Sequence, residues 1–170
     1  MKRLLYKLAG RLPCRLIDIN GKPYLERYHL AKLAGCHIML HRFVSGDSER
    51  HVHDHPWRWA LSLILTGSYL EEIAGAFEPG GWLSRVRRVR FINLSRPLTF
   101  HRIVEPVPET WTLFITGPRF KGWGFLDVAK GCDQPIVVYG QPHDVETTRD
   151  WRLHALPGEE IGRMPMREAA

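Results

Sequence analysis

Three histidines alternate with other residues in the segment RHVHDHPW (50–57), just before an apolar run. On an extended strand His51, His53 and His55 would share one face, because successive side chains point to opposite faces. Neutral imidazole is a common ligand for iron, zinc, copper and nickel. Two such histidines can bind one metal ion if a third ligand comes from another strand. A polar turn with histidines by chance is the alternative.

The third ligand must come from a later strand, and His101 in LTFHRIV (98–104) is the candidate. A buried histidine with no ligand role is the alternative there. Short apolar runs separated by turn residues predict successive strands. Their even spacing indicates an all-β sandwich or barrel and not βαβ units. The predicted strands cover 36–44, 59–67, 68–74, 82–92, 98–104 and 110–117.

The two ends of the chain differ from this region. The basic, amphipathic start MKRLLYKLAGRL predicts a short N-terminal helix that packs on the barrel. The segment 24–33 fits either a strand or a short helix. We expect one domain over residues 1–170, with the barrel core at about 24–128 and an irregular tail at about 131–170.

Composition limits the partners. The net charge of +6 permits an anionic substrate. The densest basic run would place two arginines on each face of a strand: Arg85 and Arg87 on one, Arg88 and Arg90 on the other. We find no nucleic-acid motif. No apolar run approaches the roughly 18 residues that a membrane span needs. Three cysteines without a CxxC pair predict no disulfide framework and a cytoplasmic location.

The spacing after the histidines resembles the first sequence motif of the cupins. In that motif HxH is followed by three or four residues, a glutamate, six residues and a glycine. Here His53 and His55 are followed by four residues, Ala60, six residues and Gly67. The resemblance implies a double-stranded β-helix (jelly-roll) barrel that holds one metal ion, with alanine in place of the usual glutamate.

The second cupin motif places a histidine after a proline-containing turn, as His101 follows Pro97 with a spacing one residue shorter than usual. The resemblance therefore implies His53, His55 and His101 as the metal ligands. His51 could replace His53, or lie beside the ligands as a supporting group.

Further residues near the predicted site are carboxylates. Asp54 points to the opposite face from its histidine neighbours and is predicted to bond backbone amides. Of Glu71 and Glu72, one should face the barrel interior. We prefer Glu72 as an additional ligand, a supporting partner of a ligand, or a general base.

Within the cupins, the segment 53–72 resembles thiol dioxygenases of the cysteine dioxygenase type. These are mononuclear non-haem iron enzymes with three histidine ligands, and an arginine on an earlier strand pairs with the substrate carboxylate. Arg27 stands at a corresponding place, and Trp57 and Arg119 are further candidates for substrate contact. Over the whole length, HDHPW together with TLFITGPR and WGF is similar to a group of small uncharacterised cupins of bacteria and phages.

Three functions fit these features. The first is an Fe(II)-dependent oxygenase acting on a small anionic substrate, with Zn, Mn or Ni as the alternative metals. The second is a metal-dependent sugar isomerase or epimerase, in which the ion polarises a carbonyl. The third is a barrel that binds a metal or ligand without turnover. A homodimer is expected by analogy with barrels that pair through edge strands.

Overall fold

The computed structural model describes residues 1–19, 22–45, 52–78, 81–127, 136–140 and 151–161. These residues form one α-helix, a short 3-10 helix (Trp151–Leu153) and twelve strands in two antiparallel sheets. None of the described helices is long and apolar enough to cross a membrane. His51 lies outside the described residues, as does much of the C-terminal tail.

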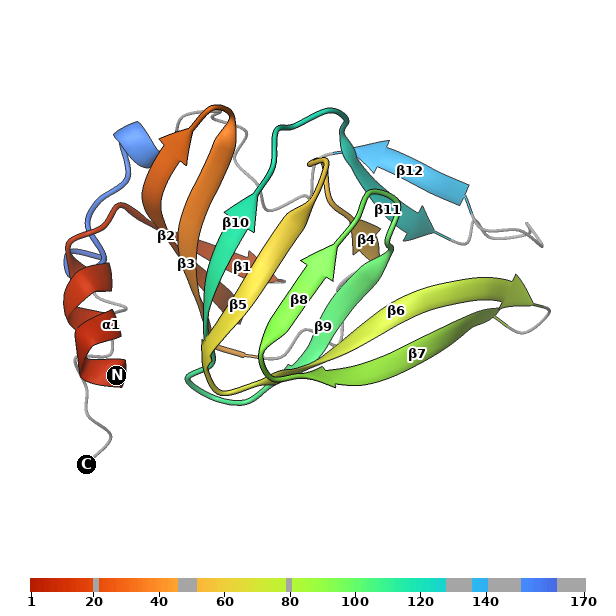
Figure 1. Cartoon of the computed structure of the whole chain (residues 1–170), viewed down its shortest axis with the longest axis horizontal. Coiled ribbons are helices and arrows are strands. Elements are labelled where there is room, and N and C mark those ends of the chain that lie inside the picture. The colour runs from red at the N-terminus through yellow and green to blue at the C-terminus, as the bar shows by residue number, and fades with distance from the viewer. Residues whose placement is uncertain (20–21, 46–51, 79–80, 128–135, 141–150, 162–170) are drawn as a thin grey trace.

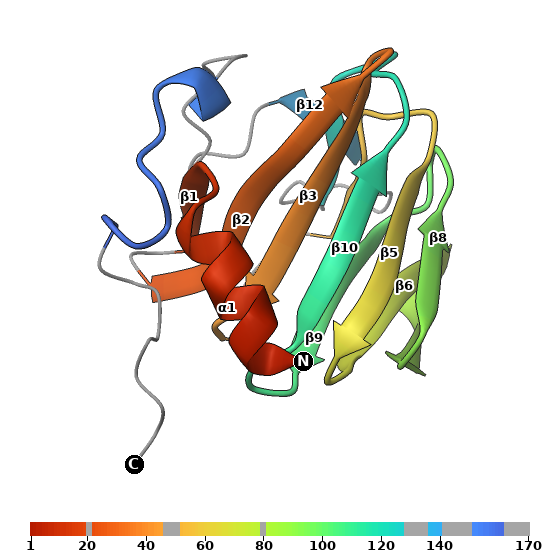
Figure 2. The same cartoon turned by 60° about the vertical axis from the view of Figure 1, so that its left-hand side comes forward.

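The N-terminal helix α1 (Lys2–Gly10) is present as predicted. It lies across the outside of the first sheet (Figure 2). Leu5 and Ala9 are buried against Tyr28, Leu40 and Trp111 of that sheet. The spacing of the two helix residues puts them on one face, so the helix covers apolar sheet surface that would otherwise face water.

The first sheet has six strands in the order β1-β2-β3-β10-β5-β8 (Figure 1). They are β1 (Cys14–Ile19), β2 (Lys22–Leu33), β3 (Cys36–Phe43), β10 (Trp111–Thr116), β5 (Ala60–Thr66) and β8 (Ile92–Ser95). The second sheet has the order β12-β11-β4-β9-β6-β7. Its strands are β12 (Ile136–Gly140), β11 (Trp123–Asp127), β4 (His53–Asp54), β9 (His101–Pro106), β6 (Tyr69–Glu78) and β7 (Gly81–Val89).

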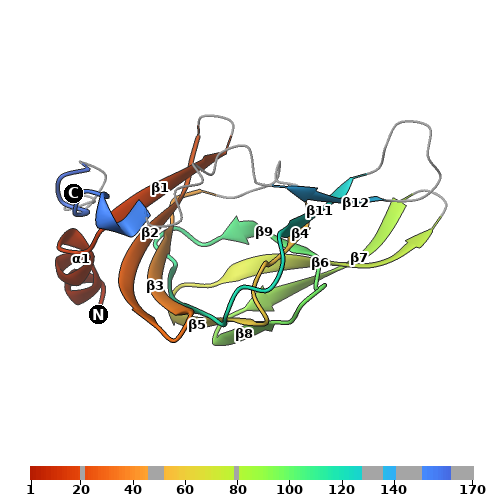
Figure 3. The ribbon, with the colours of Figure 1, turned by 90° about the horizontal axis from the view of Figure 1, so that it is seen from above.

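The strand order identifies the fold. From β3 to β10 the chain crosses repeatedly between the sheets, so that β3-β10-β5-β8 lies against β4-β9-β6-β7. Seen from above, the two sheets lie face to face (Figure 3). An eight-stranded double sheet with this order is a jelly roll, or double-stranded β-helix. The predicted all-β fold class is therefore confirmed by the topology.

Some predicted elements need correction. The segment 82–92 was expected to be one strand, but β7 ends at Val89 and β8 begins at Ile92. The chain passes from the second sheet to the first at this point, so it cannot continue as one strand. The segment 24–33 lies within strand β2. The tail contributes β12, which pairs with β11 at the edge of the second sheet.

A glycine makes the turn between β5 and β6. Gly67 has φ of 75°, in the left-handed region that favours glycine. A Cβ atom there would lie 2.3 Å from Oγ1 of Thr110. The glycine of the motif is thus required both by backbone conformation and by close packing.

Candidate metal centre

The three predicted ligands meet in the barrel interior. His53 lies directly opposite His101 on the neighbouring strands β4 and β9. Opposite residues of an antiparallel pair project from the same face, and His55 shares that face with His53 by the alternation of an extended chain. Potential ligand atoms of the three imidazoles all lie within 4.8 Å of one another. The sequence-predicted cluster is therefore brought together by the fold.

The separation of two ligand atoms fits a shared cation. Nε2 of His55 lies 2.8 Å from Nε2 of His101. Two nitrogens bound at about 2.0–2.1 Å and at right angles around one ion would lie about 2.9 Å apart. His53 and His101 are each 5% exposed, so the nitrogens are shielded from bulk water. Imidazole nitrogens so close together need a proton or a cation between them, and the donor set suits a divalent transition metal.

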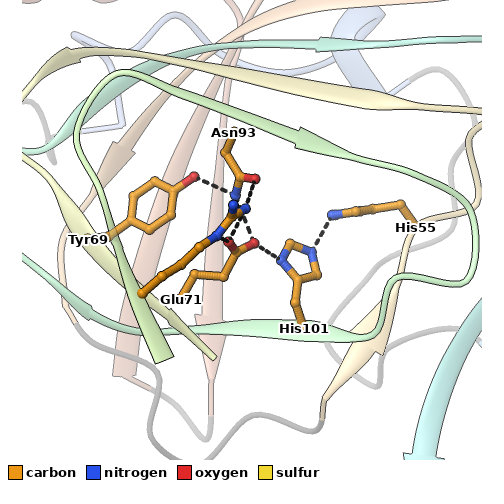
Figure 4. A network of polar contacts seen from close by, with 6 residues as sticks. His55, Tyr69, Glu71, Asn93 and His101 are labelled. Atoms are coloured by element: carbon orange, nitrogen blue, oxygen red, sulfur yellow. Dashed lines mark hydrogen bonds and ion pairs between the residues drawn. The ribbon is translucent and has the colours of Figure 1, made fainter. Parts of the chain in front are cut away.

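A carboxylate contacts one of the three histidines (Figure 4). Nδ1 of His101 lies 2.5 Å from Oε1 of Glu71, whose side chain is 1% exposed. Burial raises the pKa of Glu71, but contacts with His101, Asn93 and Arg87 outweigh it and lower the pKa to about 2. The carboxylate therefore stays ionised and accepts hydrogen bonds.

The carboxylate that contacts His101 is that of Glu71 and not that of Glu72, the residue preferred from the sequence. Nε of Arg102 donates to Oε2 of Glu72 at 2.6 Å, and Oγ of Ser84 donates to Oε1 at 2.6 Å. Neither contact involves a histidine of the cluster. Alternation on β6 gives Glu71 the same face as Ile73, which lies opposite His101. Glu72 instead lies opposite Arg102 on the other face.

A pocket adjoins the histidines and has a volume of about 60 Å³. Arg27 and Trp57, both predicted to contact substrate, line it. The Trp57 ring stacks on His55 with ring centroids 5.4 Å apart. Among the described residues no aspartate or glutamate lines this pocket. Its other polar lining residues are Tyr24, His41, Ser62, Tyr69, Asn93, Ser95 and Arg102.

Two other predicted residues lie elsewhere. Arg119 is exposed, and its Nε donates to the carbonyl oxygen of Lys121 at 3.1 Å. It is not one of the described residues that line the pocket, and its contact with substrate stays a prediction. Asp54 is fully buried and accepts from the backbone N–H of Gly124 at 2.9 Å, as expected for the face opposite the ligands.

Sequence reasoning missed three residues of the site. Arg87 on β7 and Asn93 on β8 both contact Glu71 on β6. The local sequence around these residues does not predict the contact. His41 lines the pocket from β3 at the position opposite Arg27 on β2. A signal was available for His41, because it alternates with the apolar residues Met39 and Phe43 in a predicted strand and so shares their face.

Comparisons with known proteins give matches only at the level of structure. No protein-family model matches the chain, and no curated protein matches it by sequence. KdgF from Halomonas sp. superposes with a TM-score of 0.45 and 15% identity, over 62% of this chain and 87% of that one. A double-stranded β-helix protein from Klebsiella pneumoniae gives 0.48 and 14%, over 72% and 95%.

Fe(II)-HppE with an alternative substrate gives a TM-score of 0.48 and 5% identity. That match covers 64% of this chain and 57% of the HppE chain. The assignment of the fold depends on the strand order and not on these scores. Its jelly-roll topology gives the chain a double-stranded β-helix fold, with a cluster of three histidines inside the barrel.

Proposed function

We propose that this protein is a mononuclear non-haem iron oxygenase that acts on a small anionic substrate. The histidine cluster in a cupin-type barrel supports metal dependence in general. The observation that carries the finer proposal is the composition of the cluster: it contains His53, His55 and His101, and no carboxylate among the described residues.

A neutral ligand set suits this class of reaction. The three neutral imidazoles would hold the ion without offsetting its positive charge. Fewer protein ligands also leave coordination positions for oxygen and for a substrate that binds directly. When bound, a ferrous ion supplies the oxygen chemistry that amino-acid side chains lack. Ala60, where the cupin motif has glutamate, is 1% exposed and lines the same pocket.

The pocket favours an anionic substrate. Arg27 lines it together with all three histidines. A guanidinium can bond a carboxylate at two points, and the attraction is strong in a partly buried site. Trp57, Phe114 and Trp123 form an apolar wall beside the cluster, which limits the water around a bound substrate. A small carboxylate with an apolar or thiol-bearing end fits both features.

The isomerase alternative is less well supported. Such a reaction needs a base in the pocket, and no described carboxylate lines it. Glu71 is occupied by its contacts with His101, Asn93 and Arg87. His41 accepts a hydrogen bond from Arg27 at Nε2, which occupies the lone pair that a base would use.

Oxygen uptake tests the proposal. The protein is loaded anaerobically with Fe(II) and screened with small thiols and small carboxylates in air-saturated buffer. We expect substrate-dependent uptake that is absent from the Zn(II)-loaded protein and from the double variant His53→Ala, His55→Ala. Turnover with Zn(II) or Mn(II) and no oxygen uptake would support an isomerase or hydrolase instead. Tight binding of a screened compound without turnover would support a binding barrel.

A further inference from the structure

We propose that Glu71 is a positioning residue for the metal centre, and that Arg87 and Asn93 hold its carboxylate against His101. The inference rests on the proposed metal site, because it concerns how one ligand of that site is oriented. Position 60, where the cupin motif has glutamate, holds alanine here. The carboxylate that orients a ligand would therefore come from Glu71, outside the histidine cluster.

Both oxygens of Glu71 are occupied. Oε1 receives Nδ2 of Asn93 at 2.7 Å and faces Nδ1 of His101. Oε2 receives Nε of Arg87 at 2.8 Å, and the terminal nitrogen Nη2 of Arg87 lies 2.7 Å from it. Nη2 also donates to Oδ1 of Asn93 at 2.6 Å. The three side chains therefore fix one another, and the carboxylate has one orientation.

This arrangement determines which nitrogen of His101 can bind a metal. Asn93 must turn its amide NH₂ toward Glu71, because its Oδ1 accepts from Arg87. A carboxylate that already accepts these bonds accepts another from His101, so Nδ1 carries a proton. Nε2 is then left with its lone pair, and it points toward His55. In metal sites generally, a metal-binding histidine donates its other ring N–H to a hydrogen-bond partner. That partner fixes the tautomer and the orientation of the ring.

The charge of Arg87 should also affect the reduction potential of a metal bound at the histidines. Its side chain is 40% exposed, whereas that of Glu71 is 1% exposed, so the pair connects the surface of the second sheet to the barrel interior. A negative charge near a redox metal favours the more oxidised ion, and a positive charge disfavours it. Glu71 should therefore lower the reduction potential of bound iron, and Arg87 should raise it.

Two measurements on the full-length protein test this role. The first is Zn(II) affinity, measured by competition with a chelator. We expect Glu71→Gln to weaken binding by about 10- to 100-fold, the usual effect of losing such a partner. The second is the potential of the iron-loaded protein. Here Glu71→Gln should raise the potential and Arg87→Gln should lower it, an opposition that a merely structural role would not produce.

Matched controls are adjacent in the sequence. Glu72→Gln removes the same charge from the other face of β6, where it pairs with Arg102. Arg88→Gln removes an exposed arginine whose Nη1 donates to Ser68. Neither should change the zinc affinity by more than about twofold. If Glu71→Gln does not fold, as judged by the thermal unfolding of the metal-free variants, the half-exposed Arg87→Gln decides through its potential.

The outcomes separate two failures. Tight zinc binding by the unmodified protein with unchanged affinity in Glu71→Gln would overturn this inference and leave the metal site standing. Shifts of the potential in the same direction for both variants would overturn it as well. No binding of zinc or iron by the unmodified protein would overturn the proposed centre, and this inference with it.

Discussion

Nε of Arg27 donates a hydrogen bond to Nε2 of His41, 3.0 Å away on the opposite position of the neighbouring strand. Burial, and after it the charge of Arg27, holds the pKa of His41 well below its usual range. His41 is therefore neutral and accepts from Arg27. The pair contributes one positive charge to the wall of the pocket that the three clustered histidines also line.

Replacing Arg27 should weaken substrate binding and spare the metal. In Arg27→Met we expect KM for a carboxylate substrate to rise by about 10- to 100-fold, because charge-assisted hydrogen bonds contribute about 1.5–3 kcal/mol. Metal content should not change. Steady-state oxygen uptake measures KM and kcat separately, and Arg96→Met, at an exposed position, is the control for lost charge. An unchanged KM in Arg27→Met would rule out this contact.

Restoring a carboxylate at position 60 should alter the metal centre. Ala60 faces the pocket next to Met39 and Phe114. We expect Ala60→Glu to bind a divalent ion more tightly than the unmodified protein, and to consume oxygen more slowly because a coordination position is filled. The larger side chain should cost about 1–3 kcal/mol of stability. Ala60→Gln has the same size without the charge, and equal behaviour of the two variants would contradict the prediction.

Replacing the turn glycine should destabilise the barrel. In Gly67→Ala the positive φ and the contact with Thr110 should together lower the free energy of unfolding by at least about 1–3 kcal/mol. Urea unfolding followed by tryptophan fluorescence measures this. Gly122→Ala is the control, because a Cβ atom there meets nothing within 4 Å. Equal stability of the two variants would show that the turn tolerates a side chain.

Three histidines on β2 and β3 should make the protein less stable in mild acid. Burial is the main cause that lowers the pKa values of His29, His37 and His41, that of His37 to about 4. Below their ordinary pKa of about 6.5 the unfolded chain binds protons that the folded chain does not. The free energy of unfolding should therefore fall as the pH falls from about 6.5 toward 4.

Each fully shielded histidine would contribute a slope of up to about 1.4 kcal/mol per pH unit, and half-exposed ones less. Urea unfolding of the metal-free protein between pH 7.5 and 5 measures the slope. His37→Gln should flatten it, because glutamine does not titrate. A stability that stays level or increases toward pH 5 would contradict the assigned shifts.

The part of the site that could be predicted from the sequence depends on short-range periodicity. Alternation along a strand puts His53 and His55 on one face, and the motif spacing then selects His101 from the later strands. The turn at Gly67 follows from the same spacing. The histidine pair and the turn are local features, so they need only the extended geometry of the chain, whereas His101 comes from the resemblance to the second cupin motif.

The supporting residues could not be predicted in the same way. Alternation says that Glu71 and Glu72 face opposite sides, but not which side is inside. Both faces carry apolar neighbours, Tyr69 and Ile73 beside Glu71 and Leu70 and Ala74 beside Glu72, so the local pattern does not separate them. The contacts of Arg87 and Asn93 with Glu71 depend on where the chain crosses from β7 to β8. The prediction of a single strand over 82–92 did not include that crossing.

Metal content is the most direct test of the central claim that His53, His55 and His101 form a metal site. The protein is purified without a metal-affinity tag and analysed for metals beside the double variant His53→Ala, His55→Ala. We predict a near-stoichiometric transition metal, foremost iron, in the unmodified protein and none in the variant. No bound metal in the unmodified protein, even after anaerobic reconstitution with Fe(II), would contradict the assignment.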